Sequence, residues 1–430
     1  MKFAARLAAS LSALALATGI AFAEPPTPPP PAPQGVTGEA LLPALIEHSR
    51  TTARLENGRL IGPGGDVLRR LGAESQFVVV GEEHGNAAIA QFVEAYWRDL
   101  NAIGFNYAAI EVDPWVAEAM ERELRAGDVT RWAQFIEPRG GAVVAPFFSW
   151  TPEAQLADTI VDTSRARREP ALWGLDQVFL GAAPWLLDEI AAHARDGEAR
   201  TMAASLATAA RGNLSWLGQS ESAALEALRA RLTHRRDARY AELVDAMIVS
   251  QRIYRPFSAE QGEAWFSNVE RETLMKRNFL ARYRAAERAD GAAPRVLLKF
   301  GGYHAYRGAT PTMAQGLGGF VNELAVQNGG SSLSIYIACG PGGATAGFAG
   351  PPTSCDQGFA ESWSFLAPYV STEEITIIDL RAWKLRPRRW AHLSADARQL
   401  ISSFDILVIM PNAPASEFLP GVTPPTPPAS

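Results

Sequence analysis

Several short runs of β-branched and other apolar residues most strongly constrain the fold of this chain. The runs are apolar throughout rather than at alternate positions, which is typical of strands covered by helices on both faces. They span residues 77–80, 107–112, 171–175, 296–300, 333–338, 375–380 and 406–410. Segments with helical periodicity, such as 87–100, separate the first three runs and indicate βαβ units. We therefore expect an α/β fold with a mainly parallel central sheet flanked by helices.

A long segment, about 183–289, interrupts this alternation. It is rich in alanine and arginine and contains few β-branched residues, so we predict a helical insertion subdomain packed over one end of the sheet. No proline-rich or glycine-rich linker divides residues 36–418, which we interpret as a single α/β hydrolase-like domain. Proline tracts flank it as an N-terminal linker, 24–35, and a C-terminal tail, 419–430. We expect these tracts to be extended spacers that contact partners.

The first 23 residues have the pattern of a secretory signal peptide. Lys2 and Arg6 precede an apolar run, 7–23, that ends in Ala-Phe-Ala before Glu24, which is typical of a cleavage site. A membrane anchor is the competing interpretation, but the run is short for a bilayer span and leads directly into prolines. We predict a periplasmic or secreted protein with no stable membrane insertion after cleavage.

Composition restricts the partners and the redox chemistry. The formal net charge of −6 argues against a nucleic-acid partner, because such proteins carry basic surfaces. Cys339 and Cys355 are the only cysteines in the chain. In an oxidising compartment, a pair this close in sequence favours a disulfide across its loop over a catalytic thiol.

Ionisable residues follow four of the apolar runs, at the point where each predicted strand ends. In chain order these residues are Glu82, Glu83 and His84, then Glu111 and Asp113, then Asp176, and finally Tyr303 and His304. Ligands of open α/β sheets bind beyond the carboxyl ends of the strands. We therefore expect these side chains to surround one site.

Glu82 and His84 are two residues apart, so in extended backbone they project to the same side. A carboxylate beside an imidazole orients it and raises its basicity, which makes His84 a candidate general base toward water. The alternative is structural: Glu82 or Glu83 lies at the positive N-terminal end of the next helix, and His84 packs in the turn. Glu111 and His304 favour the functional interpretation.

A predicted helix that begins near Ser258, with that hydroxyl as its N-cap, adds an arginine to the candidates. Arg271, Met275 and Asn278 share one stripe of this helix. A buried arginine needs an anionic partner, such as Glu82, Glu111 or a substrate oxyanion. The alternative is an exposed ion pair with a neighbouring acid.

Motifs of other enzyme classes do not occur in the sequence. It has no Gly-x-Ser-x-Gly elbow, no Gly-x-x-x-x-Gly-Lys loop and no His-Glu-x-x-His helix. The glycines of 340–343 lie between the cysteines and favour a closed loop over a nucleotide site. Trp150, Trp173 and Trp265 either line a pocket or pack in the core.

Several of these segments occur in an order that resembles a known superfamily. They are 78–85, with the sequence VVVGEEHG, then 110–113, 150–153 and 174–176, then Arg271 with Met275 and Asn278, and finally His304. The set is similar to the erythromycin-esterase-like and ChaN-like superfamily, which includes the TIKI proteases. The resemblance covers most of the core and implies a site formed by Glu82, His84, Glu111 and His304.

The resemblance implies different chemistry for different members. Resemblance to the esterase-like members implies metal-independent, histidine-assisted attack of water on a lactone ester. Resemblance to the TIKI-like members implies metal-dependent peptide cleavage, and resemblance to the ChaN-like members implies an association with haem and iron. The Glu-x-His turn at Glu82 and His84 resembles ChaN-like proteins, because esterases place one more residue between the two. The segments with Trp150, Glu153 and Asp176 look more esterase-like.

The leading hypothesis is an exported hydrolase of an ester, lactone or amide bond, with His84 as general base aligned by Glu82. Arg271 and His304 stabilise the oxyanion, Glu111 completes the polar cluster, and no cofactor is required. We assign contacts with a small-molecule or peptide substrate to Glu83, Asp113, Trp150, Asp176, Asn278 and Tyr303. The alternative is a haem-binding or metal-binding protein of iron uptake without hydrolytic activity. In that case the ligands of a divalent metal ion or haem come from His84, His304, Glu82 and Glu111.

Overall fold

The computed structural model describes residues 26–31, 38–166, 168–258 and 264–425. Within these ranges, nine strands form one sheet in the order β2-β1-β10-β11-β7-β3-β6-β4-β5. Every neighbouring pair from β11 to β5 is parallel, and the pairs from β2 to β11 are antiparallel. The predicted α/β fold with a mainly parallel sheet is confirmed.

The seven predicted apolar runs correspond to seven of the nine strands of this sheet. These are β3 (Phe77–Glu82), β4 (Tyr107–Ile110), β5 (Leu172–Gly174), β6 (Val296–Gly301), β7 (Ser332–Cys339), β10 (Ile375–Asp379) and β11 (Ile406–Met410). The two strands of this sheet that were not predicted are β1 (Arg50–Glu56) and β2 (Arg59–Ile61). Both lie on its antiparallel side and are partly exposed. β1 is largely polar and β2 has only three residues, so neither has the apolar pattern of the strands at the centre of the sheet.

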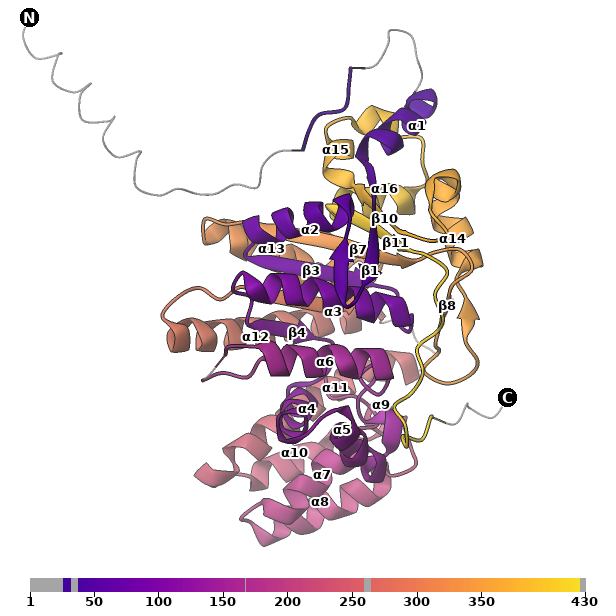
Figure 1. The fold of residues 1–430 in the computed structure, drawn as a ribbon. Helices are drawn as coiled ribbons and strands as arrows, with labels where there is room; N and C mark the ends of the chain where they lie inside the picture. The colour runs from indigo at the N-terminus through magenta and orange to yellow at the C-terminus, as the bar shows by residue number, and fades with distance from the viewer. Residues whose placement is uncertain (1–25, 32–37, 167, 259–263, 426–430) are drawn as a thin grey trace, which may run out of the picture.

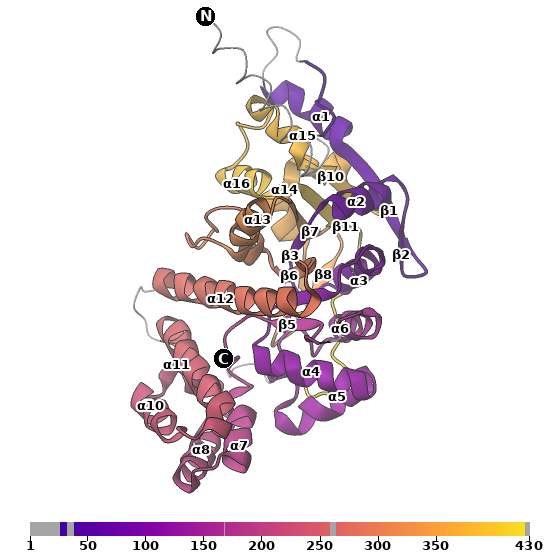
Figure 2. The same cartoon turned by 90° about the vertical axis from the view of Figure 1, so that its left-hand side faces the viewer.

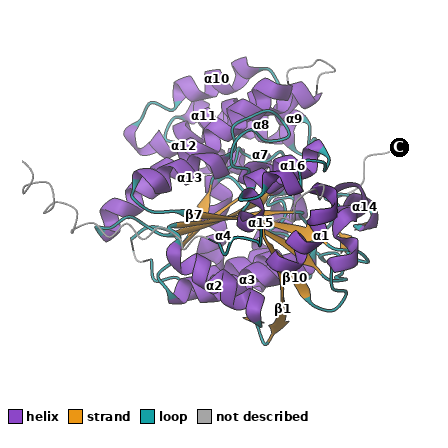
Figure 3. Cartoon of the chain, turned by 90° about the horizontal axis from the view of Figure 1, so that it is seen from above, coloured by secondary structure: helices purple, strands orange, loops and turns teal. Residues whose placement is uncertain are grey.

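Helices cover both faces of the sheet, as Figures 1 and 3 show. One face packs against α2 (Pro63–Glu74), α3 (Ala87–Ala102), α4 (Pro114–Ala126) and α6 (Thr151–Thr163). The opposite face packs against α1 (Gly38–Ser49), α12 (Ala264–Asp290), α13 (Leu317–Gln327), α15 (Leu380–Lys384) and α16 (Ala395–Ser403). Successive residues of β3 alternate between the two cores, with Val78 and Val80 in the first and Phe77 and Val79 in the second.

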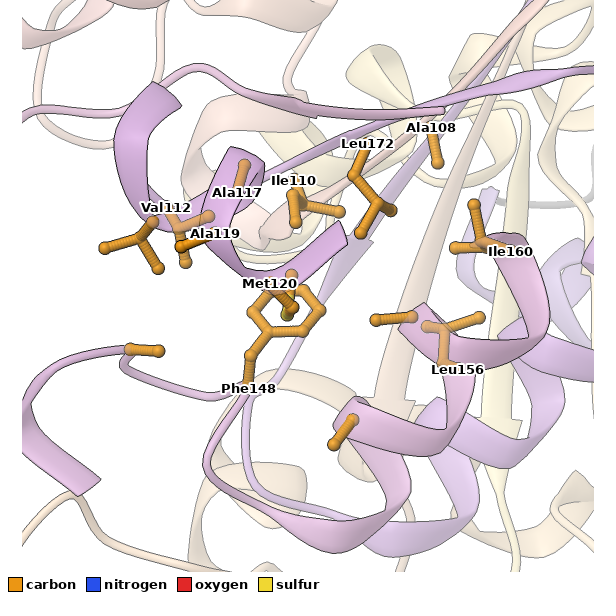
Figure 4. Packing of buried hydrophobic residues seen from close by; sticks show 14 of the residues in the cluster. Ala108, Ile110, Val112, Ala117, Ala119, Met120, Phe148, Leu156, Ile160 and Leu172 are labelled. Atoms are coloured by element: carbon orange, nitrogen blue, oxygen red, sulfur yellow. The ribbon is translucent and has the colours of Figure 1, made fainter. Parts of the chain in front are cut away.

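The first core continues to the β5 end of the sheet. Figure 4 shows the labelled side chains of β4 and β5 together with those of α4 and α6, among them Ile110, Leu172, Met120, Leu156 and Ile160. These apolar side chains are buried. They fix the ends of β4 and β5, from which several candidate site residues project.

The segment between β5 and β6 is helical, as its composition predicts. It contains α7 (Ala183–His193), α8 (Gly197–Ala210), α9 (Trp216–Gln219), α10 (Ser222–Arg231), α11 (Ala238–Ser258) and α12. Figure 2 shows α7, α8, α10 and α11 grouped below α12, together with the nearby α4 and α5 (Val129–Ile136). Ser258, which the sequence predicts as the N-cap of the next helix, belongs instead to α11, and residues 259–263 lie outside the described residues. The described part of α12 begins at Ala264.

Two segments that follow β7 and β11 lie against the turn after β3. A disulfide joins Cys339 and Cys355, whose Cα atoms are 5.9 Å apart, and closes a loop that contains β8 (Ala344–Thr345) and β9 (Thr353–Ser354) before α14 (Asp356–Trp363). Ala346 N of this loop donates to Gly85 O at 2.8 Å. Ser416 N, from the extended segment 411–423, donates to the same oxygen at 2.7 Å.

The chain remains packed beyond residue 418, where the sequence placed the start of a tail. Leu419 and Val422 are buried in the first core, and Thr423 N donates to Glu137 Oε2 at 2.7 Å. Part of the predicted N-terminal linker also contacts the folded domain, because Arg389 donates a hydrogen bond to Pro30 O. The predicted signal peptide, residues 1–23, lies outside the described residues. In the parts of the chain that the structure describes, no helix has the length and apolarity needed to cross a bilayer.

We expect removal of the disulfide to destabilise the protein. Replacement of Cys339 and Cys355 by alanine should lower the free energy of unfolding by about 3 kcal/mol, because the bond restricts a loop of this length in the unfolded chain. Urea denaturation followed by circular dichroism measures the change. The wild-type protein in reducing buffer is the matched control and should lose the same amount. Equal stability of the oxidised and reduced wild-type protein would contradict the prediction.

Candidate functional site

Parallel register brings the ends of β3, β4 and β6 to one edge of the sheet. Glu82, the last residue of β3, is opposite Gly301, the last residue of β6, and β4 pairs with β6 on its other side. Glu82, His84, Glu111 and His304 therefore meet, as the sequence predicts, although they are far apart in the chain. The site that they form also includes residues of α12.

Glu82 and His84 form a carboxylate–imidazole pair. His84 Nδ1 lies 2.8 Å from Glu82 Oε1, and the glutamate side chain is fully buried. The imidazole stacks on Phe147, with ring centroids 3.7 Å apart and planes inclined by 11°. Phe147 has φ of 67°, a left-handed conformation that is costly for an aromatic residue. The pair holds the ring of His84 in one orientation, while 23% of the side chain remains exposed.

His304 belongs to a second carboxylate–imidazole pair. Its Nδ1 lies 2.5 Å from Oε1 of Glu272, a buried residue of α12. The other oxygen of Glu272 accepts from Leu317 N at 2.8 Å. Glu272 could not be identified as a site residue from the sequence, because a glutamate in a polar helix gives no signal of burial. Its position directly after Arg271 was the only available indication.

Glu111 lies between the two imidazoles. His84 Nε2 is 3.3 Å from Glu111 Oε2, and His304 Nε2 is 3.4 Å from Glu111 Oε1. Gly301 N donates to Glu111 Oε2 at 2.6 Å, and Arg271 Nη2 donates to Oε1 at 2.9 Å. Glu111 is therefore surrounded by donors and positive charges, and it is the common partner of both histidines.

Arg271 extends from α12 to the end of β5. Its Nε and Nη2 atoms contact Oδ1 and Oδ2 of Asp176 at 2.9 and 2.5 Å, and Nε also donates to Gln177 Oε1 at 2.9 Å. Arg271 keeps 25% of its side chain exposed. Arg271 therefore has two anionic partners, Glu111 and Asp176, where the sequence led us to expect one. These fixed contacts orient the guanidinium beside His304.

Behind Glu82 lies a buried lysine. Lys299 Nζ, from β6, is 2.6 Å from Glu82 Oε1 and 2.8 Å from Glu153 Oε2 of α6. The three side chains are 4% exposed or less. Lys299 lies inside the apolar run 296–300, and no role was predicted for it from the sequence. A lysine within a buried strand was the signal that indicated an internal ion pair.

The charges around the two histidines favour their protonated forms. Burial alone would lower the pKa of His84, but Glu111 and Glu82 outweigh it and raise the pKa to about 9. Burial and Arg271 oppose protonation of His304, yet Glu111 and Glu272 raise its pKa to about 9 as well. Burial disfavours ionisation of Glu111, but the two imidazoles hold its pKa well below its usual range. At neutral pH the central group therefore consists of a carboxylate between two imidazolium rings.

Other predicted site residues do not face this cluster. Asp113 caps α4 by accepting from Trp115 N and Val116 N, and its burial raises its pKa to about 7. Glu83 accepts from Tyr336 and from Cys339 N, whereas Asn278 donates to Leu175 O. These contacts hold loops and helices that support the site.

The tryptophans and Tyr303 also differ in position. Trp150 is buried 5.7 Å from Phe147, measured between ring centroids, and so lies behind the ring that stacks on His84. Trp173 is in the core beside Tyr107. Trp265 and Tyr303 are largely exposed, and Tyr303 precedes His304 directly.

The candidate ligands do not fit a metal ion or haem iron. Glu82 is in direct contact with Lys299, and Glu111 with Arg271, so a metal cation bound to these carboxylates would lie beside two fixed positive charges. Each imidazole has one nitrogen beside a buried glutamate and the other beside Glu111. No three His, Cys, Asp or Glu side chains in the described ranges are arranged to hold a metal ion.

Comparison with solved structures places the fold among proteins of low sequence identity. A protein described as a succinoglycan biosynthesis protein matches with a TM-score of 0.59 and 14% identity, over 90% of this chain and 99% of that one. A Bacillus cereus protein matches with a TM-score of 0.57 and 12% identity, over 89% and 98%. A histidine-to-asparagine mutant of the erythromycin esterase EreC in its open conformation gives 0.54 and 15%, over 85% and 98%.

The sequence itself gives no such match: no protein-family model and no curated protein matches it. At 12–15% identity, the structural likeness is one of fold. The chain has the fold of an erythromycin esterase, and the resemblance seen in the sequence is confirmed at that level.

The raised pKa of His84 predicts a loss of stability at alkaline pH. A histidine whose folded-state pKa is about 9, above an unfolded value of about 6.5, adds stability below pH 6.5 that disappears as pH rises through 9. Urea denaturation at pH 6.5 and 9.5 should show a smaller decrease in His84→Gln than in the wild type. His193→Gln, at an exposed histidine, should keep the wild-type decrease. An unchanged decrease in His84→Gln would contradict the prediction.

Proposed function

We propose that this chain is an exported hydrolase of the erythromycin-esterase-like type that cleaves an ester, lactone or amide bond. The observation that carries the proposal is the geometry of His84. Its ring is fixed by the buried Glu82 and by Phe147, remains partly open to solvent, and presents Nε2 beside Glu111. An oriented imidazole with one side open is what general-base activation of water requires.

The mechanism begins with neutral His84. Its Nε2 takes a proton from water while the water oxygen forms a bond with the substrate carbonyl carbon. The carbonyl π electrons move to oxygen and give a tetrahedral oxyanion. When this intermediate collapses, the bond to the leaving alkoxide or amine breaks, and the proton on His84 Nε2 passes to that group. Glu82 keeps Nδ1 protonated and stabilises the imidazolium formed during the reaction.

Positive charge for the oxyanion comes from Arg271 and His304. Both lie against Glu111, and their positions are fixed by Asp176 and Glu272. Donors that are already oriented need little reorganisation as negative charge develops, which is the largest contribution in many acyl-transfer enzymes. The roles require His84 to be neutral while His304 is protonated. Both histidines have a pKa of about 9, so the form with one proton on the pair is most populated near that pH. We assign His84 as the neutral partner, because it is the more exposed ring.

Export and substrate type complete the proposal. The signal-like first 23 residues and the disulfide agree with a periplasmic or secreted protein. The substrate is a small molecule or peptide, and the net negative charge argues against nucleic acid.

The pH dependence of hydrolysis tests the role of His84. With p-nitrophenyl butyrate, corrected for spontaneous hydrolysis, kcat/KM should increase about tenfold per pH unit and pass through a maximum near pH 9, because His84 must lose its proton while His304 keeps its own. His84→Gln should abolish this activity with little change in the circular dichroism spectrum. A lactone and amide panel then identifies the preferred bond. Full activity of His84→Gln on every hydrolysed substrate would refute the proposal.

Gly301 provides a steric test of the same geometry. A Cβ atom at this position would lie 2.7 Å from His84 Nε2 and 3.4 Å from Glu111 Oε2. Gly301→Ala should therefore displace His84 and lower kcat/KM about 10- to 100-fold. Gly358→Ala is the matched control, since a Cβ there meets nothing within 4 Å, and it should retain wild-type kcat/KM. Equal activity of the two variants would contradict the assigned geometry.

A further inference from the structure

The buried Glu82–Lys299–Glu153 group lies behind the candidate base, and two of its members, Lys299 and Glu153, take no part in the mechanism above. Lys299 Nζ contacts one oxygen of each glutamate, at 2.6 and 2.8 Å. The group comes from three elements, β3, β6 and α6. A buried ion pair is weak evidence for a stabilising role, because apolar residues of similar volume are often at least as favourable. The position of this group next to His84 points to another role.

Lys299 and His84 contact the same oxygen atom. Glu82 Oε1 lies 2.6 Å from Lys299 Nζ and 2.8 Å from His84 Nδ1. Over the described part of the chain, the other oxygen, Oε2, is buried without a hydrogen-bond partner. The ammonium and the imidazole therefore compete for the negative charge of one atom. Any change in the electrostatic attraction between Lys299 and Glu82 must therefore change the attraction between Glu82 and protonated His84.

We propose that Lys299 and Glu153 are positioning residues that set the protonation equilibrium of His84 through Glu82. Lys299 weakens the attraction between Glu82 and protonated His84, and Glu153 partly withdraws Lys299 from Glu82. The two residues therefore act in opposite directions on the same imidazole. The consequence of this control for turnover rests on the proposed function, whereas the control itself does not.

The sign of each effect follows from the charges that face His84. Glu82, Glu111 and Glu153 favour its protonated form, and Lys299, Arg271 and His304 disfavour it. Burial raises the pKa of Glu153 to about 7, against the opposing effect of Lys299. Glu153 is therefore ionised where His84 titrates, near pH 9. Loss of the Glu153 charge should lower the pKa of His84, and loss of the Lys299 charge should raise it.

Nuclear magnetic resonance of the histidine rings in the full-length mature protein tests this without a substrate. The His84 signal is identified as the one missing from His84→Gln, and its pKa is measured between pH 5 and 11. Glu153→Gln, which keeps the shape of the side chain, should lower the pKa by about 0.5 to 1 unit. Lys299→Met should raise it by a similar amount. Opposite shifts would not result from a purely structural role, which predicts loss of stability alone.

Asp405→Asn is the matched control. Asp405 is also a buried carboxylate that pairs with two cations, Arg307 and Lys384. It directly precedes β11, at the amino ends of the parallel strands, whereas His84 lies at their carboxyl ends. Its variant should leave the pKa of His84 unchanged. An unchanged pKa in Glu153→Gln, or an equal shift in Asp405→Asn, would overturn the proposal. If Lys299→Met does not fold, Glu153→Gln decides the question alone.

Turnover of p-nitrophenyl butyrate by the same variants separates the two proposals. Shifted His84 titration in a protein that turns over neither this ester nor any member of the lactone and amide panel supports the positioning role and refutes the hydrolase. Turnover by the wild type with unshifted titration in Glu153→Gln supports the hydrolase and refutes the positioning role. Where both hold, the rising limb of kcat/KM against pH should move with the His84 pKa, downward in Glu153→Gln and upward in Lys299→Met.

Discussion

The arrangement of the site depends on one buried carboxylate, Glu111. Two imidazoles and a guanidinium converge on its two oxygens, and these three positive groups would repel one another without it. The contacts require the ends of β3, β6 and β4 to lie side by side at one edge of the sheet, with α12 across them. The parallel order β3-β6-β4 meets the first requirement. Packing of Met275 and Phe279 in the second core meets the other, because it fixes α12 on the sheet.

Local backbone constraints hold this arrangement from the side of His84. Phe147 adopts a left-handed conformation and stacks on the imidazole, a conformation that persists only where the surrounding structure enforces it. Gly85 has φ of 85°, and any Cβ there would meet Ala346 O at 2.5 Å. The disulfide loop and the 411–423 segment both bond to Gly85 O. Segments remote in sequence therefore determine the position of the turn that carries His84.

The main features of the fold and the centre of the site could be predicted, because each has a local pattern. The apolar runs gave the central strands, and the polar residues directly after them gave Glu82, His84, Glu111 and His304. Edge strands β1 and β2 were not predicted, since exposed strands need no apolar pattern. Glu272 and Lys299 were not assigned roles because their importance comes from burial against residues 32 and 217 positions away. Asp113 was assigned to substrate, but it caps α4.

The sequence by itself determined the alternation of strands and helices, the cysteine pair and which ionisable residues follow the strands, since each depends on neighbours along the chain. Tertiary structure alone decided the charge state of those residues. A pKa depends on burial and on distances between charges, and the charges that raise the pKa of His84 come from separate elements. The sequence could therefore name the histidine as a base. Only the packed structure gives it a pKa of about 9 and connects it, through Glu82, to the buried Lys299.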